Sequence, residues 1–265
     1  MKFICVFCGS SEQGALKYAE ITKKIGQTIV ANGYGLVYGA GNVGLMKVLA
    51  DSVLEAGGEV IGVITPEVRQ LGVVHAGIKK ENLYEEQTYS ARKARMAALS
   101  VGFLALPGGL GTLDELTEVA IYNQFAGYKN TPDNPVKPCA ILNADGFFDG
   151  LSNQLTRCRE EKFMTQKHLD MILFTRDPIA AVMHIIQFKG YTPDDSRWWE
   201  ASNEKAKEKR DDSAKPISAV SAFWNNKLLT LGSGAFKTGL FAFKMLTQKN
   251  GDAQINNLSS MPKLS

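Results

Sequence analysis

The sequence predicts an α/β protein with a Rossmann-like, doubly wound parallel sheet, helices on both faces of the sheet, and a C-terminal extension. Up to about residue 190, short apolar runs alternate with helical patterns. The runs are four to six residues long and apolar on both faces, which is typical of parallel strands that are covered on both sides. After Gly190 this alternation stops and the chain becomes polar and rich in turn-forming residues.

Each element follows from its own segment of the chain. The expected strands fall at 2–7, 35–38, 59–64, 101–106, 137–142 and 171–174. The helical patterns between them fall at 15–31, 43–56, 88–100, 111–126, 147–161 and 177–188. Ligands of doubly wound sheets lie outside the carboxyl ends of the strands. Residues that bind a ligand are therefore expected in the loops 8–14, 39–43, 65–87 and 107–112.

Two regions are expected in the 265 residues: a Rossmann-like domain at 1–190 and an extension at 191–265. The extension opens with a polar, charged stretch typical of a linker or a solvated helix. Residues 217–248 are apolar again, and apolar surface of this extent seldom stays exposed on a soluble monomer. We expect this segment to pack on an outer surface, a partner subunit or a membrane face, with catalysis confined to 1–190.

Composition excludes several classes of protein. A hydrophobic fraction of 45% and a charged fraction of 22% are those of an ordinary soluble globular protein. The net charge of +3 lies entirely in 191–265 and is too small to indicate a nucleic-acid partner. No apolar run is long enough for a transmembrane segment. No signal peptide is expected, because the first apolar run is short and the chain becomes polar soon after it. The four cysteines lack metal-ligand spacing, so reduced thiols in a cytoplasmic protein are expected.

The second expected strand runs into the glycine-rich segment GAGNVG at 39–44. Three interpretations stay open. A dinucleotide site needs an acid at the end of the next strand, and that strand ends in Val63-Ile64-Thr65. The glycines can instead serve a tight turn and close helix–strand contact. Alternatively, the backbone at Gly41 approaches another nucleotide or a sugar phosphate.

A second glycine loop, Pro107-Gly108-Gly109-Leu110-Gly111-Thr112, leads from a strand directly into a helix. Its three glycines leave the backbone N–H groups exposed, and the helix N-terminus adds partial positive charge. Together they form an anion site suited to a phosphate. The hydroxyl of Thr112 can donate to the same phosphate.

A structural alternative explains part of this loop. Thr112 and Glu115 have the spacing of a capping box, which needs no ligand. Such a box does not explain two glycines after a proline. Glu118 lies one turn beyond Glu115 on the same helical face. Two carboxylates beside an anion site repel the ligand, so they indicate that cationic charge develops nearby during a reaction.

The expected helix 88–100 supplies positively charged side chains beside the second glycine loop and its carboxylates. Arg92, Arg95 and Met96 share one face of it. A charge run on a helix is commonly a solvated surface. Arg92 differs because its helix leads into the strand that ends at the second glycine loop.

These segments resemble one family. Residues 107–115 match the P-G-G-x-G-T-x-x-E signature of the LOG (Lonely guy) family of cytokinin riboside 5′-monophosphate phosphoribohydrolases. Arg92-Lys93-x-x-Met96 matches its companion motif R-K-x-x-M. Cys8-Gly9-Ser10-Ser11 and the segment 39–46 match its other two loops in order and spacing. The resemblance covers about residues 1–190.

The resemblance implies a Rossmann-like homodimer that hydrolyses the N-glycosidic bond of a nucleoside 5′-monophosphate without a metal or a cofactor. Glu115 would stand near the ribose and stabilise oxocarbenium-like charge, and Arg92 would orient Glu115 or reach the phosphate. The residues expected to bind substrate are Gly108, Gly109, Gly111, Thr112, Ser10, Gly41, Lys93, Met96 and Glu118. The three histidines form no ligand constellation.

The chain departs from the family in places that bear on substrate choice. Members often have M-H-x-R-K where this chain has Tyr89-Ser90-Ala91 before Arg92, and G-G-G where it has Gly39-Ala40-Gly41. Hydrolysis is therefore better supported than preference for an isopentenyl-type base. The label lysine decarboxylase, attached to some members, requires a Schiff-base lysine that the sequence does not indicate.

Two functions of different classes remain. The first is a nucleoside-monophosphate glycosidase, which Glu115 favours. The second is a non-catalytic nucleotide sensor or carrier on the same fold, which the extension favours, because fold alone does not decide function.

Overall fold

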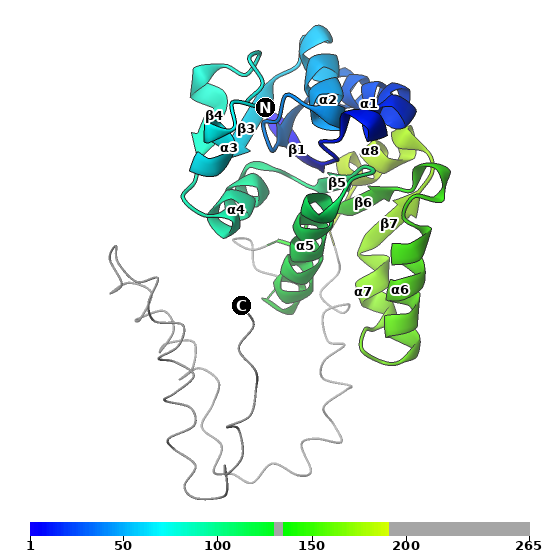
Figure 1. Cartoon of the computed structure of the whole chain (residues 1–265). Coiled ribbons are helices and arrows are strands. Elements are labelled where there is room, and N and C mark those ends of the chain that lie inside the picture. The colour runs from blue at the N-terminus through cyan, green and yellow to red at the C-terminus, as the bar shows by residue number, and fades with distance from the viewer. Residues whose placement is uncertain (130–134, 191–265) are drawn as a thin grey trace, which may run out of the picture. The chain divides into compact units, whose positions relative to one another are not determined.

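Seven parallel strands form one sheet in the computed structural model, which describes residues 1–129 and 135–190, with the backbone alone at 125–129 (Figure 1). Their order across the sheet is β4-β3-β2-β1-β5-β6-β7. The strands are β1 (Lys2–Phe7), β2 (Tyr34–Tyr38), β3 (Val60–Ile64), β4 (Leu83–Glu85), β5 (Phe103–Ala105), β6 (Cys139–Leu142) and β7 (Ile172–Thr175). Because the order reverses between β1 and β5, a crevice opens between the carboxyl ends of these two strands.

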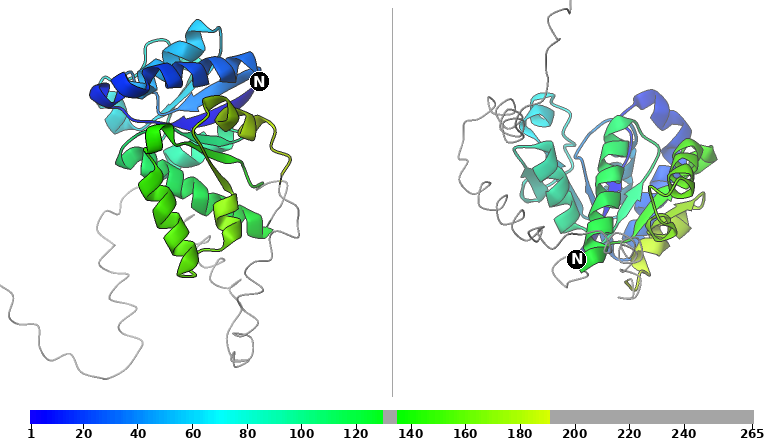
Figure 2. Two further views of the ribbon diagram at one scale, coloured as in Figure 1. Left: turned by 90° about the vertical axis from the view of Figure 1, so that its right-hand side faces the viewer. Right: turned by 90° about the horizontal axis from the view of Figure 1, so that it is seen from below.

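Helices cover both faces of the sheet (Figure 2). One face carries α1 (Glu12–Ala31), α2 (Gly44–Glu55) and α8 (Pro178–Ile186). The opposite face carries α4 (Tyr89–Leu99), α5 (Leu110–Lys129) and α6 (Asp149–Glu160). Two short helices, α3 (Pro66–Gln70) and α7 (Gln166–Asp170), lie in connections. The expected fold class is confirmed.

Local chemistry sets where the helices begin. Ser11 precedes α1, and its Oγ accepts a hydrogen bond from the Gly14 N–H at 3.2 Å. Asp177 precedes α8, and its carboxylate accepts from the Ile179 N–H at 2.8 Å, with Pro178 in the first helical position. Both are N-caps that satisfy helix N–H groups lacking an intrahelical partner.

The hydrophobic core has two layers because alternate strand residues point to opposite faces. Ile4, Leu36 and Leu104 pack toward α1, α2 and α8. Cys5, Val37 and Phe103 pack toward α4, α5 and α6. The core thus holds the carboxyl ends of β1 and β5 side by side, and the Leu106 N–H donates to the Phe7 carbonyl at 2.9 Å.

The structure differs from the sequence-based expectation mainly within 65–87. That segment contains α3 and β4, neither of which was expected. β4 pairs with β3 at the edge of the sheet. It has only three residues, Leu-Tyr-Glu, so its sequence shows no apolar run that would predict a strand. The extension at 191–265 lies outside the described residues. Among the helices that are described, none is long and apolar enough to span a bilayer.

Candidate functional site

The loop after β5 packs against the loop after β1, backbone to backbone. The Gly9 N–H donates to the Pro107 carbonyl at 3.0 Å. A Cβ built on Gly108 would lie 2.1 Å from Thr112 Oγ1 and 2.9 Å from the Gly9 nitrogen. Only glycine fits at 108, because a side chain there would displace backbone.

Helix α5 starts within this glycine loop. The Leu113 N–H donates to the Gly109 carbonyl at 3.1 Å, so Thr112 lies inside the first turn and is 3% exposed. The capping box weighed from the sequence is therefore wrong in its geometry, because Thr112 does not precede the helix. A Cβ on Gly109 or Gly111 would meet nothing within 4 Å. Neither position would bring a side chain against the rest of the fold, and the first N–H groups of a helix lack intrahelical partners, as an anion site requires.

Glu115 points from the second turn of α5 toward α4. Its Oε1 accepts a hydrogen bond from Arg92 Nη1 at 3.0 Å, and the two side chains are 13% and 11% exposed. Burial raises the pKa of the Glu115 carboxyl above its usual range, while the Arg92 guanidinium acts in the opposite direction. The pair is a buried, charge-assisted contact at the carboxyl edge of the sheet.

Arg92 is held by the ends of two strands as well as by Glu115. Its Nε donates to the Val63 carbonyl at 2.8 Å. A Cβ on Gly39 would lie 2.3 Å from Arg92 Nη2. Gly39 at the end of β2 therefore leaves the room that the guanidinium occupies. The sequence alone could not show this contact, because 53 positions separate the two residues.

Two residues expected to bind substrate, Lys93 and Glu118, also join two helices. Lys93 Nζ contacts both Asp114 carboxylate oxygens, at 3.0 and 2.8 Å, and also contacts Glu118. Lys93 is largely buried, and its pairs fix α4 to α5. Lys93 and Glu118 thus join α4 to α5, and both also line the cavity that Glu115 lines, so their contact with substrate stays a prediction.

Met96 lies in the core rather than at the surface of a cavity. It is 1% exposed and packs in the layer between the sheet and the helices α4, α5 and α6. The expected contact of Met96 with substrate does not agree with this position, because a buried thioether is the ordinary outcome for methionine on the inner face of a helix.

The segment 39–44 is shaped by close packing. Gly44 has φ +55°, and a Cβ there would lie 2.5 Å from the Ser10 carbonyl carbon. The Leu45 N–H donates to the Gly9 carbonyl at 3.0 Å. Gly41 is buried beneath Met46. Of the three interpretations, turn geometry and close packing explain these glycines. Ser10 and Ser11, which lie at this contact, are exposed.

Two cavities flank the glycine loop. One, of about 280 Å³, lies toward α1 and is lined in part by Ser10, Gly108 and Gly109. The other, of about 430 Å³, lies between α4 and α5 and is lined in part by Glu115 and Lys93. Two of the aromatic residues in these walls, Tyr18 and Tyr122, were not anticipated. Only tertiary packing brings them to the site, and their local sequence carries no motif.

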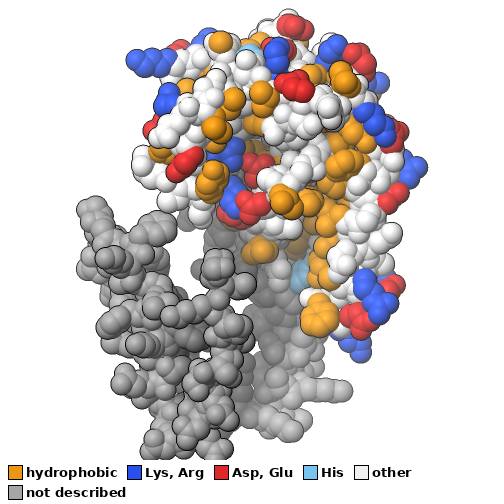
Figure 3. Space-filling view, in the orientation of Figure 1, with side chains coloured by type: hydrophobic (Ala, Val, Ile, Leu, Met, Phe, Trp, Pro, Cys, Tyr) orange, Lys and Arg blue, Asp and Glu red, His pale blue; other side chains and the backbone are white. Residues whose placement is uncertain are grey.

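The histidines have structural contacts. His75 Nδ1 accepts from the Gly77 N–H at 3.0 Å, so Nε2 carries the proton and donates to Asp51 Oδ1 at 3.0 Å. Within residues 1–129 and 135–190, His, Cys, Asp and Glu side chains form no group of three or more that could hold a metal ion. On the face shown in Figure 3, basic and acidic side chains are interspersed.

A parallel α/β fold with a glycine loop at its topological switch point defines a Rossmann-like protein of the nucleotide-binding class. Within that class, residues 46–185 match the family described as "Possible lysine decarboxylase". The chain belongs to this family, the LOG family that its motifs predicted.

Named relatives agree with this assignment. The chain is 34% identical over 175 residues to the probable cytokinin riboside 5′-monophosphate phosphoribohydrolase LOGL6 of Oryza sativa subsp. japonica, covering 66% of each chain. It is 34% identical to LOGL9 of the same species, covering 70% of this chain and 78% of LOGL9. With LOG1 of Arabidopsis thaliana the identity is 34%, over 63% of this chain and 76% of LOG1. The chain thus spans about two thirds of the length of LOGL6.

Solved structures show the same fold. The X-ray structure of TM1055 has a TM-score of 0.51 at 19% identity and covers 71% of this chain and all of that chain. A molybdenum cofactor binding protein from Rippkaea orientalis has a TM-score of 0.50 at 22% identity, covering 70% of this chain and 95% of its own. At these identities the likeness concerns the fold alone.

The family description as a lysine decarboxylase implies pyridoxal phosphate bound to a lysine, and the residues do not fit it. Lys93 is paired with carboxylates, and Lys137 Nζ donates to the carbonyls of Ala97 and Ser100 at 2.5 and 2.8 Å. Among the described residues that line the α1-side cavity, none is a lysine. A Schiff base requires an uncommitted amine, so these lysines support no chemistry through that cofactor.

Proposed function

We propose that the protein hydrolyses the N-glycosidic bond of a nucleoside 5′-monophosphate, AMP or an N6-substituted AMP of the cytokinin type, to free base and ribose 5-phosphate. The observation that carries the proposal is the buried pair that Glu115, on the helix that begins in the glycine loop, forms with Arg92 of α4. The names of the relatives at 34% identity support the same reaction.

The 5′-phosphate binds at the N-terminus of α5. Its negative charge faces the N–H groups of Gly109, Leu110 and Gly111, where the helix dipole is positive. No side chain blocks the approach at Gly109 or Gly111. The phosphate is remote from the bond that breaks, so its binding energy positions the sugar.

Gly111 and Glu115 share a helical face, one turn apart, so a ribose held by its phosphate lies along that face. The Glu115 carboxylate accepts hydrogen bonds from ribose hydroxyls and opposes the positive charge that develops at C1′ as the base leaves. The bond between C1′ and the base nitrogen breaks, and its electron pair goes to the nitrogen. The oxygen of water bonds to C1′, and the proton that this water loses protonates the base. Arg92 opposes the rise that burial causes in the pKa of Glu115, and it holds the carboxylate in position.

The proposal includes a dimeric assembly and a cytoplasmic location. The dimer is what the family resemblance implies. Three buried thiols, Cys5, Cys8 and Cys139, and the partly exposed Cys158 are unpaired, as in a reducing compartment. Light scattering on the purified chain tests the dimer, since a monomer mass would contradict it.

The direct test is incubation of the protein with AMP and quantification of adenine and ribose 5-phosphate by chromatography. Hydrolysis predicts that the two products appear in equal amounts. Tight binding of AMP without release of either product would instead indicate the sensor or carrier function. N6-isopentenyl-AMP, assayed beside AMP, identifies the preferred base.

A further inference from the structure

Ala40, just after the carboxyl end of β2, has a strained backbone conformation. Its φ is +61°, in the left-handed region that residues other than glycine seldom adopt, because the Cβ there crowds the following carbonyl oxygen. Three described residues other than glycine have a positive φ, and of these Ala40 is the buried one. Such strain persists only where neighbouring contacts impose it, and it is concentrated at functional sites.

The segment 73–75 supplies the contacts that impose this conformation. The His75 N–H donates to the Ala40 carbonyl at 2.9 Å, and the Asn42 N–H donates to the Val73 carbonyl at 2.7 Å. The two hydrogen bonds hold the chain on both sides of the turn. The left-handed conformation at Ala40 is therefore kept as long as both bonds remain.

The His75 side chain fixes this segment to α2. The imidazole is 7% exposed, its Nδ1 accepts from the Gly77 N–H at 3.0 Å, and its Nε2 donates to Asp51 Oδ1 at 3.0 Å. Asp51 also pairs with Lys47 of the same helix. Removal of the imidazole would leave a cavity and a buried N–H group without its partner, so the segment depends on this side chain.

Gly39 connects the strained turn to the Glu115 site. It precedes Ala40, and the Arg92 guanidinium occupies the space where a Gly39 side chain would lie. On the other side of Gly39, Tyr38 is paired with Gly62 of β3, which holds the strand end in place. A change of conformation at Ala40 would therefore move the peptide group of Gly39, beside the guanidinium.

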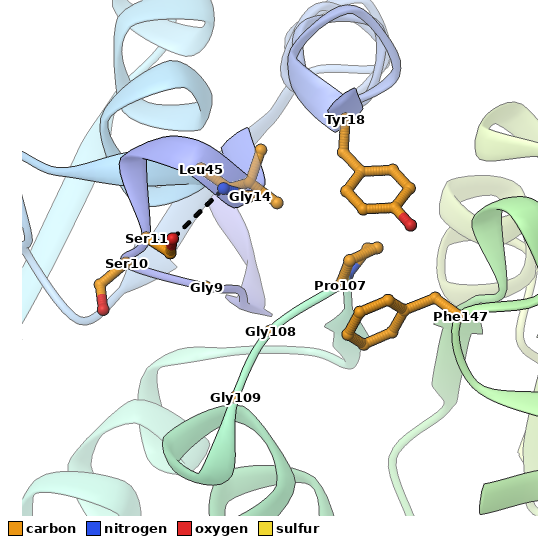
Figure 4. Close-up of a pocket in the computed structure, with 10 residues that line it drawn as sticks. All are labelled: Gly9, Ser10, Ser11, Gly14, Tyr18, Leu45, Pro107, Gly108, Gly109 and Phe147. Atoms are coloured by element: carbon orange, nitrogen blue, oxygen red, sulfur yellow. Dashed lines mark hydrogen bonds between the residues drawn. The ribbon is translucent and has the colours of Figure 1, made fainter. Parts of the chain in front are cut away.

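The chain after Ala40 is held at the loop that follows β1. The Leu45 N–H donates to the Gly9 carbonyl at 3.0 Å, and these two residues line one cavity (Figure 4). Both ends of the segment 39–45 are thus fixed. The strain at Ala40 can be released only between them, next to Arg92.

We propose that His75 and Ala40 are positioning residues for Arg92. His75 fixes the segment 73–75, which keeps Ala40 left-handed. The turn at Ala40 keeps the Arg92 guanidinium within reach of Glu115. The effect on catalysis rests on the proposed hydrolysis, whereas the placement of Arg92 does not. Neither His75 nor Ala40 lines the two cavities beside the glycine loop.

Hydrogen exchange of the Arg92 Nε–H, followed by NMR on the full-length protein, reports this placement without catalysis. The group donates to the Val63 carbonyl at 2.8 Å, and its signal is identified by its loss in Arg92→Gln. In His75→Ala we expect exchange to be faster by about tenfold or more, because the guanidinium leaves this hydrogen bond more often. The kcat for AMP should fall by about tenfold or more, with a smaller change in KM, because the positioning of Glu115 is lost.

Ala40→Gly separates positioning from a general loss of stability. Glycine adopts the left-handed conformation without strain, so it keeps the turn when His75 no longer imposes it. The double variant His75→Ala, Ala40→Gly should therefore recover an exchange rate and a kcat within about threefold of the wild-type values.

His168→Ala is the matched control. His168 is 6% exposed, and its Nδ1 likewise accepts from a backbone N–H, that of Thr165. It lies in α7 and lines neither cavity beside the glycine loop. The control should leave both the exchange rate of Arg92 and kcat unchanged.

Asp51→Ala replaces His75→Ala if the latter does not fold, because it removes the partner of His75 Nε2 and should change exchange and kcat in the same directions. The proposal is overturned if the folded variant exchanges the Arg92 proton at the wild-type rate or keeps the wild-type kcat. It is also overturned if Ala40→Gly restores neither quantity. Faster exchange with rescue, in a protein whose wild type releases no adenine from AMP, would support the positioning of Arg92 and reject the proposed hydrolysis.

Discussion

At the scale of single residues, the site depends on the buried contact between Arg92 and Glu115. Glu115 and Arg92 were expected to lie near each other, with the Arg92 partner left open between carboxylate and phosphate. The structure gives a direct hydrogen bond to Glu115 at 3.0 Å. The positions of Val63 and Gly39 beside Arg92 could not be predicted, because they depend on how two strand ends and a helix pack.

Replacing Arg92 by glutamine should move the acid limb of the pH–rate profile. Catalysis requires ionised Glu115, and burial raises its pKa while Arg92 lowers it. Arg92→Gln removes the lowering influence, so the pKa rises further and kcat/KM begins to fall at a higher pH than in the wild type. Rates of AMP hydrolysis from pH 4 to 8 check this. An acid limb that stays in place or moves to lower pH would show that Glu115 does not control it.

Gly39→Ala should lower the rate of AMP hydrolysis, although the added methyl group does not lie in the ligand site itself. The new methyl group would lie 2.3 Å from the present position of Arg92 Nη2, so the guanidinium must move. Misplacement on this scale costs roughly 10 to 10²-fold in rate. Gly150→Ala is the control, since the added methyl group meets no neighbour. Equal rates for the two variants, measured on folded protein, would argue against a positioning role for Gly39.

At the scale of elements, long apolar strands and amphipathic helices were predictable and short edge elements were not. The expected range 2–7 coincides with β1, and 88–100 contains α4 within a residue at each end. β4 and α7 were not predicted, because segments of three to five residues are too short to show the periodicity of a strand or a helix. The expected helix 111–126 starts one residue later than α5, which begins at Leu110, because the glycine loop continues directly into the helix.

The N-terminus of α5 should make the enzyme selective for a phosphate. AMP gains charge-assisted hydrogen bonds from backbone N–H groups that adenosine cannot form. These bonds to a charged group are worth about 1.5–3 kcal/mol each. We therefore expect kcat/KM for AMP to exceed that for adenosine by at least tenfold, measured as adenine release. Equal values for the two substrates would rule out the phosphate site at this loop.

At the scale of the whole molecule, the described residues already form a sheet with helices on both faces. Every residue proposed to contact substrate belongs to this part of the chain. The division at Gly190, which the change in composition after that residue indicates, stays a prediction. What the extension does could not be predicted, because its composition carries no motif.

A chain that ends at Gly190 should therefore hydrolyse AMP. Its folding is checked by circular dichroism and its rate by adenine release, with the full-length protein beside it. We expect kcat within a few-fold of the full-length value, since no catalytic group is removed. A folded but inactive truncated protein would show that residues 191–265 contribute to the site.

The most direct test of the catalytic role of Glu115 is the turnover of AMP by Glu115→Gln, with Asp114→Asn as the matched control. Both variants remove one carboxylate from the same turn of α5, but Asp114 is 62% exposed and contacts Lys93, which keeps its contact with Glu118. We predict a folded Glu115→Gln protein whose turnover is lower by on the order of 10²-fold or more, the scale for losing a preorganised electrostatic group. Asp114→Asn should retain most of the wild-type rate. A folded Glu115→Gln protein that releases adenine at the wild-type rate would contradict the catalytic assignment.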